Sequence, residues 1–189
     1  MKAPYLLALM LIGFAAAPSR AETVNTESQA LFTRIATVLK SPRCMNCHTD
    51  ADHPFPRQGD DRHRHLFNVA RGPSDIGAPG LHCGTCHQDK NNAASGVPGA
   101  PGWRLAPLSM AWEGLSDREI CRELLDPTRN GQRNAAALAD HFAHEALVAW
   151  AWSPGTDHNG RARATPPMTH DEFNRMVERW LATGAACPE

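Results

Sequence analysis

The amino-acid sequence predicts a mostly α-helical fold with extensive irregular loops. Apolar residues recur at helical spacing near the N-terminus and again through the C-terminal half. No segment shows the strict alternation of apolar and polar residues that a half-buried strand requires. Two long stretches, 49–82 and 88–107, are polar and rich in proline and glycine, and no helical period continues through them.

The N-terminus has the features of an export signal. Lys2 supplies a positive charge, an almost unbroken apolar run covers 5–17, and a small-residue cleavage site follows at 19–21. Because the run is too short to span a bilayer as a stable helix, an uncleaved membrane anchor is the weaker alternative. We expect residues 1–21 to be a signal peptide, and residues 22–189 to form one periplasmic domain with no membrane span.

The first helix is expected over 22–43. Thr26 with Gln29 fits a capping box, and Pro42 is expected to end the helix. The apolar residues at helical spacing are Ala30, Leu31, Ile35, Val38 and Leu39. This helix would lead directly into the first cysteine motif of the chain.

Further helices are expected in the C-terminal half. Ser116 and Glu119 fit a capping box at the start of one helix. Residues 133–150 have a helical pattern of apolar positions. A last helix, with the clearest apolar stripe, should begin after Thr169 and end at Gly184.

The charge balance of the chain gives no sign of nucleic-acid binding. The chain has 19 basic and 20 acidic residues, and its net charge is −1. Without residues 1–21 there remain 17 basic and 20 acidic residues, a net charge of −3. Nothing in this balance suggests nucleic-acid binding, whereas a mildly acidic surface is compatible with docking to another protein.

The most informative feature is a pentapeptide, Cys-x-x-Cys-His, that occurs twice. Among 189 residues with 6 cysteines and 10 histidines, random order would give roughly 0.01 copies. In an exported chain this motif is typical of covalent c-type haem, with two thioether-forming cysteines and an axial histidine. We therefore expect two covalently bound haem c groups, held by Cys44, Cys47 and His48 and by Cys83, Cys86 and His87.

Two alternatives for these motifs are weaker. Two Cys-x-x-Cys pairs could bind one tetrahedral zinc ion, but zinc does not need a histidine directly after each second cysteine. A thioredoxin-like redox pair would be surrounded by a βαβ pattern, which neither motif has.

The two remaining cysteines are Cys121 and Cys187. In an oxidising compartment two leftover thiols are usually joined, so we expect a disulfide between them. The alternative is two separate buried thiols that pack as small apolar groups.

The sixth ligand of each iron decides between electron transfer and catalysis. Met110 is the expected methionine ligand, because it lies in a loop just before a capped helix; packing within that loop is its alternative role. Met168 lies in a similar place and is the weaker candidate. Met176 lies on the apolar stripe of the last helix and is expected in the core.

Histidines outside the motifs are the other candidate ligands. His141 lies near the apolar face of its helix and His65 lies in the first long loop, so either could reach an iron. Such a histidine is more often a hydrogen-bonded core residue. His63 and His144 are weaker candidates, and His82 is too close to its own motif but could serve the other iron.

With these motifs placed, the chain resembles a known family, the small secreted dihaem cytochromes identified as isoquinoline 1-oxidoreductase subunits. The resemblance rests on the stretches 80–87, 96–99, 105–114, 126–131 and 147–155. It implies a cytochrome c-like dihaem domain and a redox partner of the molybdenum hydroxylase class. Nothing in the sequence would hold a molybdenum cofactor or an iron–sulfur cluster.

The leading hypothesis is therefore a periplasmic electron carrier and not an enzyme. It would pass single electrons from a molybdenum hydroxylase-type dehydrogenase to a second acceptor leading to the respiratory chain. The alternative is a haem enzyme with an open axial site that acts on peroxide or a small sulfur compound. A haem sensor is the third hypothesis, for which no signalling segment is present.

Overall fold

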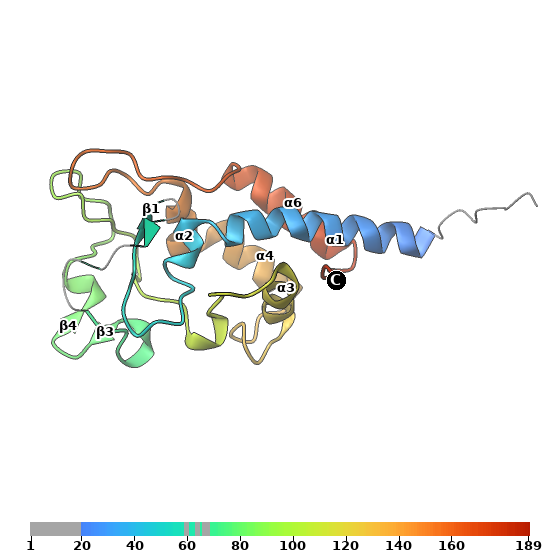
Figure 1. Ribbon diagram of the computed structural model, residues 1–189, viewed down its shortest axis with the longest axis horizontal. Coiled ribbons are helices and arrows are strands. Elements are labelled where there is room, and N and C mark those ends of the chain that lie inside the picture. The colour runs from blue at the N-terminus through green and yellow to red at the C-terminus, as the bar shows by residue number, and fades with distance from the viewer. Residues whose placement is uncertain (1–19, 59–60, 63–64, 66–68) are drawn as a thin grey trace, which may run out of the picture.

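The computed structural model describes residues 20–58, 61–62, 65 and 69–189, and these are mostly helical (Figure 1). The predicted mostly α fold with long irregular segments is confirmed. Most of the predicted signal peptide lies outside the described residues. The six helices of the described part are α1 (Arg20–Leu39), α2 (Pro42–Met45), α3 (Asp117–Leu125), α4 (Ala135–His144), α5 (Ala146–Ala149) and α6 (His170–Ala182).

Strands in the described part of the chain are very short. β1 (Arg57–Gln58) pairs antiparallel with β2 (Asp61–Arg62), and β3 (Gly77–Ala78) pairs antiparallel with β4 (Leu81–His82). The expectation of no strand is wrong for these segments, which are too short to show an alternating pattern. The described residues also form four 3-10 turns: η1 (Pro73–Asp75), η2 (Cys83–Thr85), η3 (Leu108–Met110) and η4 (Trp150–Trp152).

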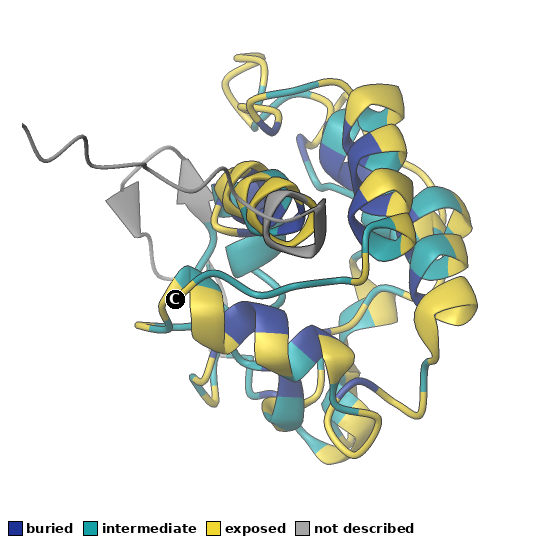
Figure 2. Ribbon diagram, turned by 90° about the vertical axis from the view of Figure 1, so that its right-hand side faces the viewer, coloured by how far each residue is buried: buried dark blue, intermediate teal, exposed yellow. Residues whose placement is uncertain are grey.

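The elements divide the molecule into a helical end and a loop end. Figure 1 shows α1, α3, α4 and α6 grouped at one end and the loops with β1, β3 and β4 at the other. The short helix α2 lies between the two ends. Viewed along the long axis, the helices turn their buried residues toward one another and their exposed residues outward (Figure 2).

Helix α1 supplies one wall of the core. Phe32, Ile35 and Val38 are fully buried on one face of this helix, as their spacing of three residues predicts. The ring centroid of Phe32 lies 4.9 Å from that of Trp180 on α6. The predicted capping box at Thr26 is wrong, because α1 begins at Arg20 and Thr26 lies inside it.

The ends of the other helices follow mainly from local capping. Ser116 and Thr169 form the expected capping boxes of α3 and α6 with the glutamates three residues on. The single helix expected over 133–150 is instead α4, α5 and η4. The break lies at Glu145, whose backbone is extended with φ −65° and ψ 121°.

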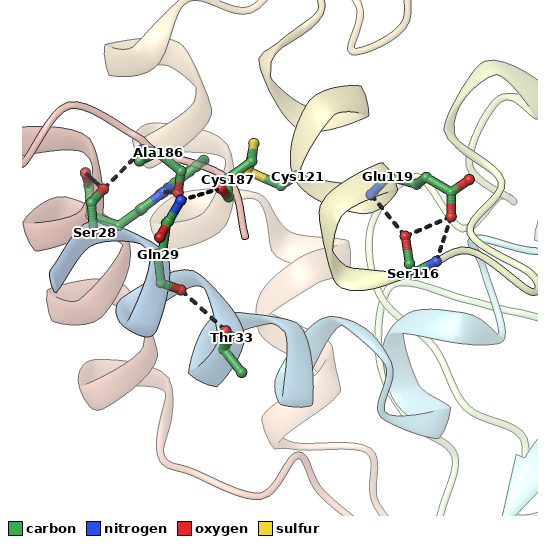
Figure 3. The surroundings of a disulfide bond; sticks show 9 residues. Ser28, Gln29, Thr33, Ser116, Glu119, Cys121, Ala186 and Cys187 are labelled. Atoms are coloured by element: carbon green, nitrogen blue, oxygen red, sulfur yellow. Dashed lines mark hydrogen bonds between the residues drawn. A yellow bond between two sulfur atoms is a disulfide. The ribbon is translucent and has the colours of Figure 1, made fainter. Parts of the chain in front are cut away.

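The C-terminal segment is fastened to α1 and α3 (Figure 3). The Ser28 hydroxyl accepts a hydrogen bond from the backbone N–H of Ala186 at 2.9 Å, and the Gln29 amide donates to the carbonyl of Cys187 at 3.1 Å. The expected disulfide between Cys121 and Cys187 is present and joins α3 to the chain end across 66 residues. These contacts close the helical end of the molecule.

Loss of this disulfide should lower stability. Replacing Cys187 by Ser removes a cross-link that closes a loop of 66 residues, and the free energy of unfolding should fall by about 4 kcal/mol. Denaturant unfolding of the oxidised protein measures the change. Cys121→Ser should have the same effect, and the double variant should be no less stable than either single one. Equal midpoints with and without reductant would contradict the prediction.

Candidate functional site

Both cysteine motifs fold as one helical turn. In the first, the backbone N–H of His48 donates to the carbonyl of Cys44 at 3.0 Å; in the second, His87 donates to Cys83 at 2.9 Å. The Pro42 expected to end the first helix instead occupies the first turn of α2, which carries Cys44. Residues three and four apart on a helical turn share one face, so each turn presents two thiols and an imidazole together.

His48 is held from behind by the segment that follows η3. Its Nδ1 donates to the carbonyl of Met110 at 2.7 Å, and its ring stacks on Trp112 with centroids 3.5 Å apart. The backbone N–H of Trp112 donates in turn to the carbonyl of His48 at 2.9 Å. With Nδ1 protonated, Nε2 carries the lone pair that a metal requires.

His87 is held in the same way by different residues. Its Nδ1 donates to the carbonyl of Pro98 at 2.7 Å, and its ring stacks on Trp103 with centroids 4.4 Å apart. Gly99, which follows the acceptor, lies so close to the carbonyl oxygens of Gln88 and Lys90 that a Cβ would approach each to 2.3 Å. Only glycine therefore allows the loop to bring this carbonyl behind His87.

Burial keeps these imidazoles neutral. It lowers the pKa of His48 to about 4, with the neighbouring His141 acting in the same direction and the Met110 carbonyl opposing it. Burial also lowers the pKa of His87, with smaller effects from His65 and Arg163. A neutral imidazole is the form that binds iron, so both motif histidines are ready to act as ligands at neutral pH.

The first motif opens onto a partly open cavity of about 170 Å³. Burial raises the pKa of the Cys44 thiol to about 11 and that of Cys47 to about 12, so both are protonated at neutral pH. The cavity wall is mainly apolar, with Leu39, Leu124, Leu138, Phe142 and Phe173 among its residues. The second motif is more open, since Cys86 is exposed and Cys83 is half-buried.

The structure brings His141 to the first motif. His141 lies in the last turn of α4, lines the same cavity as His48 and shifts the pKa of that residue. Burial, followed by the cation of Arg133, lowers the pKa of His141 itself to about 4. His144 on the same helix is exposed and paired with Asp140 at 2.8 Å.

His65 lies beside the second motif. Its ring centroid is 6.1 Å from that of His87, with 55° between the ring planes. Two imidazoles that bind one metal ion from opposite sides at about 2.0–2.1 Å have centroids about 6 Å apart. The predicted ligand candidates His65 and His87 therefore lie at a suitable separation to share an iron.

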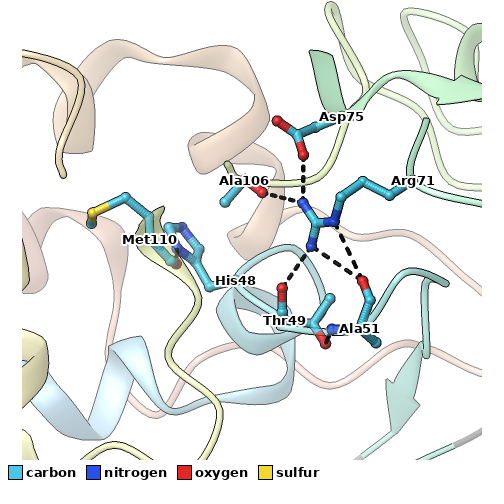
Figure 4. Close-up of polar contacts among 7 residues, drawn as sticks. All are labelled: His48, Thr49, Ala51, Arg71, Asp75, Ala106 and Met110. Atoms are coloured by element: carbon cyan, nitrogen blue, oxygen red, sulfur yellow. Dashed lines mark hydrogen bonds and ion pairs between the residues drawn. The ribbon is translucent and has the colours of Figure 1, made fainter. Parts of the chain in front are cut away.

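Met110 occupies a different place from the histidine candidates. Its side chain is buried in the helical core and reaches the cavity, while its backbone carbonyl holds Nδ1 of His48 (Figure 4). The Met110 backbone thus lies on the Nδ1 side of the imidazole that would bind iron. A sixth ligand must approach the iron from the side opposite this imidazole.

The weaker ligand candidates lie elsewhere. Met168 accepts a hydrogen bond from the Trp152 indole through its carbonyl, and Met176 is in the core as expected. His82 is exposed in β4. His63 lies outside the described residues.

Arginines near the motifs were not singled out from the sequence. Arg43, Arg104 and Arg133 line the cavity, and Arg43 is 4% exposed beside Cys44. Burial lowers the pKa of Arg43, and the neighbouring cation of Arg163 lowers it further. Arg163 donates to the backbone carbonyls of 96, 154 and 156. An arginine that bonds to backbone carbonyls needs no acidic residue at a fixed spacing. The sequence therefore gives no sign of its role.

These residues fit a covalently attached haem. Each turn offers two thiols that are not in disulfides and an imidazole with an available Nε2. The arginines around the first cavity can pair with carboxylates of a porphyrin. Within the described residues, the indole Nε1 of Trp112 is buried in the cavity wall with no hydrogen-bond partner, a donor that a bound group could satisfy.

Comparisons with protein-family models, curated proteins and solved structures found no match for this chain. Among the described helices, none combines the length and apolar character needed to cross a membrane. In the same part of the chain, no three histidine, cysteine or acidic side chains are grouped closely enough to hold a metal ion by themselves.

Two half-buried imidazoles should link stability to pH. His48 and His141 have pKa values of about 4 in the folded protein, against about 6.5 in an unfolded chain. Between these values the unfolded chain binds more protons, so the free energy of unfolding should fall as the pH drops from 6.5 toward 4. Above that range their contribution is fully present.

The measurement is urea unfolding of the haem-free protein at a series of pH values, because imidazoles bound to iron would not titrate in this range. In His141→Gln the free energy of unfolding should change less steeply with pH, by at most about 1.4 kcal/mol per pH unit. His144→Gln, on the exposed side of the same helix, is the matched control and should leave the slope unchanged. An unchanged slope in His141→Gln would contradict the assignment.

Proposed function

We propose that this chain is a dihaem c-type electron carrier. Cys44, Cys47 and His48 would hold one haem, and a second would be held at Cys83, Cys86 and His87. Bound haem iron alternates between the ferric and ferrous states and so exchanges single electrons. The chain's own residues attach the two groups, orient their ligands and limit access of water.

One observation carries the proposal: each motif histidine is prepared as a ligand in the same way. At both motifs Nδ1 donates to a backbone carbonyl at 2.7 Å and the ring stacks on a tryptophan. This bond fixes the tautomer and the ring orientation, as it does for most metal-binding histidines. A purely structural role would not require both features at both motifs.

The partner histidines favour electron transfer over catalysis. His141 faces the first cavity and His65 lies beside His87. With two histidine ligands on each iron, neither iron would have an open position for peroxide or a small sulfur compound. We therefore assign the sixth positions to His141 and His65, and a packing role to Met110.

The physiological setting is part of the proposal. The Cys121–Cys187 disulfide and the predicted export signal favour the periplasm, where disulfides persist. The family resemblance favours a molybdenum hydroxylase-type dehydrogenase as electron donor, with a second redox protein as acceptor. The more exposed second motif, with Cys86 at the surface, is the better place for such a partner to exchange electrons.

The proposal predicts two covalent haems per chain. Protein exported in a host that matures c-type cytochromes should retain haem after denaturation, with two haems per polypeptide in the pyridine haemochrome assay. Cys47→Ser and Cys86→Ser should each weaken attachment at one motif only. Retention of no covalent haem by the matured protein would overturn the proposal.

Axial ligation can be read from the spin state. His141→Ala should convert one haem of two to a high-spin form that binds one equivalent of carbon monoxide when reduced, because it empties one sixth position. Met110→Leu, which keeps the backbone carbonyl and a similar volume, should leave both haems low-spin. High-spin haem in Met110→Leu but not in His141→Ala would reverse the assignment.

A further inference from the structure

A buried arginine joins the segments around the two motifs. The side chain of Arg71 is 5% exposed, and its guanidinium donates to the carbonyls of Thr49 and Ala106 at 2.6 Å each (Figure 4). It also donates to the carbonyl of Ala51 and to the carboxylate of Asp75, the latter at 2.6 Å. One side chain thus ties together three segments that are distant in sequence.

The three segments connect directly to the motifs. On one side, Thr49 follows His48, and the backbone N–H of Ala106 donates to the carbonyl of Cys47 at 3.0 Å. On the other side, Asp75 precedes Ile76, whose carbonyl accepts from the N–H of Cys83 at 2.7 Å.

The bonded groups therefore form a continuous bridge between the turns. In order it contains Cys47, Ala106, Arg71, Asp75, Ile76 and Cys83. A parallel bond, from the N–H of Leu105 to the carbonyl of Asp75 at 3.0 Å, reinforces its centre.

We propose that Arg71 is a positioning residue that fixes the distance and mutual orientation of the two haem-bearing turns. This inference rests on the proposed function, because the orientation of the turns matters only if both carry haem. The planar guanidinium can donate in several fixed directions at once, whereas a lysine ammonium cannot reproduce that fork. Removing it would leave three carbonyls without this donor, one of them on the buried Thr49.

The test is the Soret circular dichroism of the dihaem protein, in which neighbouring porphyrins give a two-signed band that depends on their relative orientation. Arg71→Gln should retain two haems and lose at least half of the amplitude of this band. Arg71→Lys should recover only part of it. Both midpoint potentials should fall in Arg71→Gln, because loss of a nearby cation favours the ferric state, and recover in Arg71→Lys.

Control variants separate the bridge from general stability. Asp75→Ala should also reduce the band, because it frees the end of the bridge nearest the second motif. The double variant should lose no more than Arg71→Gln alone, since both changes break one connection. Arg129→Gln, which removes an arginine–carboxylate pair with Glu123 on the helical end, should leave the band and both potentials unchanged.

Wild-type band amplitude in both Arg71→Gln and Asp75→Ala, with two haems each, would overturn the inference. If Arg71→Gln does not accumulate, Asp75→Ala decides alone. If the wild-type protein binds no haem, the proposed function fails and the bridge is tested separately by hydrogen exchange of the Ala106 and Cys83 amides. Unchanged protection of these amides in Asp75→Ala would then reject the bridge as well.

Discussion

The hydrogen bond from Nδ1 of His48 to the carbonyl of Met110 constrains the rest of the first site. It commits one ring nitrogen to the protein and leaves the other for a metal. It also requires the segment before α3 to run along the motif, so that Trp112 stacks on the imidazole and bonds to the His48 carbonyl. The backbone carbonyl of Met110 is thereby held at Nδ1 of His48, while His141 on α4 lines the same cavity.

Features that depend on contacts between residues close in sequence could be predicted, whereas features that depend on distant contacts could not. The starts of α3 and α6 were predictable because their caps lie within four residues. The thiols and motif histidines followed from spacing alone.

The break at Glu145 was missed because the apolar pattern continues through it. Met110 was preferred as a ligand because a pattern shows side chains, whereas this residue bonds to His48 through its backbone carbonyl. His65 and His141 could be named as candidates, but only the fold shows that His141 lies near the first motif and His65 near the second.

Arginines that bond to main-chain oxygens show a second limit of sequence patterns. Arg71 donates to three backbone carbonyls besides its one carboxylate, and Arg163 donates to three carbonyls. Backbone acceptors are available at every position, so no charge pairing along the chain marks these residues in advance. Yet they hold the long proline- and glycine-rich loops, which have little regular structure of their own. The order of these loops therefore depends on a few cations bonded to main-chain oxygens.

The two motifs are electrostatically unequal, because the second is more exposed to water. Arg43 and Arg71 both act on Cys47, which is half-buried, whereas Cys86 is exposed to water. A ferric haem with two neutral histidine ligands carries one more positive charge than its ferrous form, so burial and nearby cations both disfavour the ferric state. The proposed function then implies the higher reduction potential at the first motif. An electron received at the exposed second motif would move toward the buried first one, and the Arg71 bridge lies between the two.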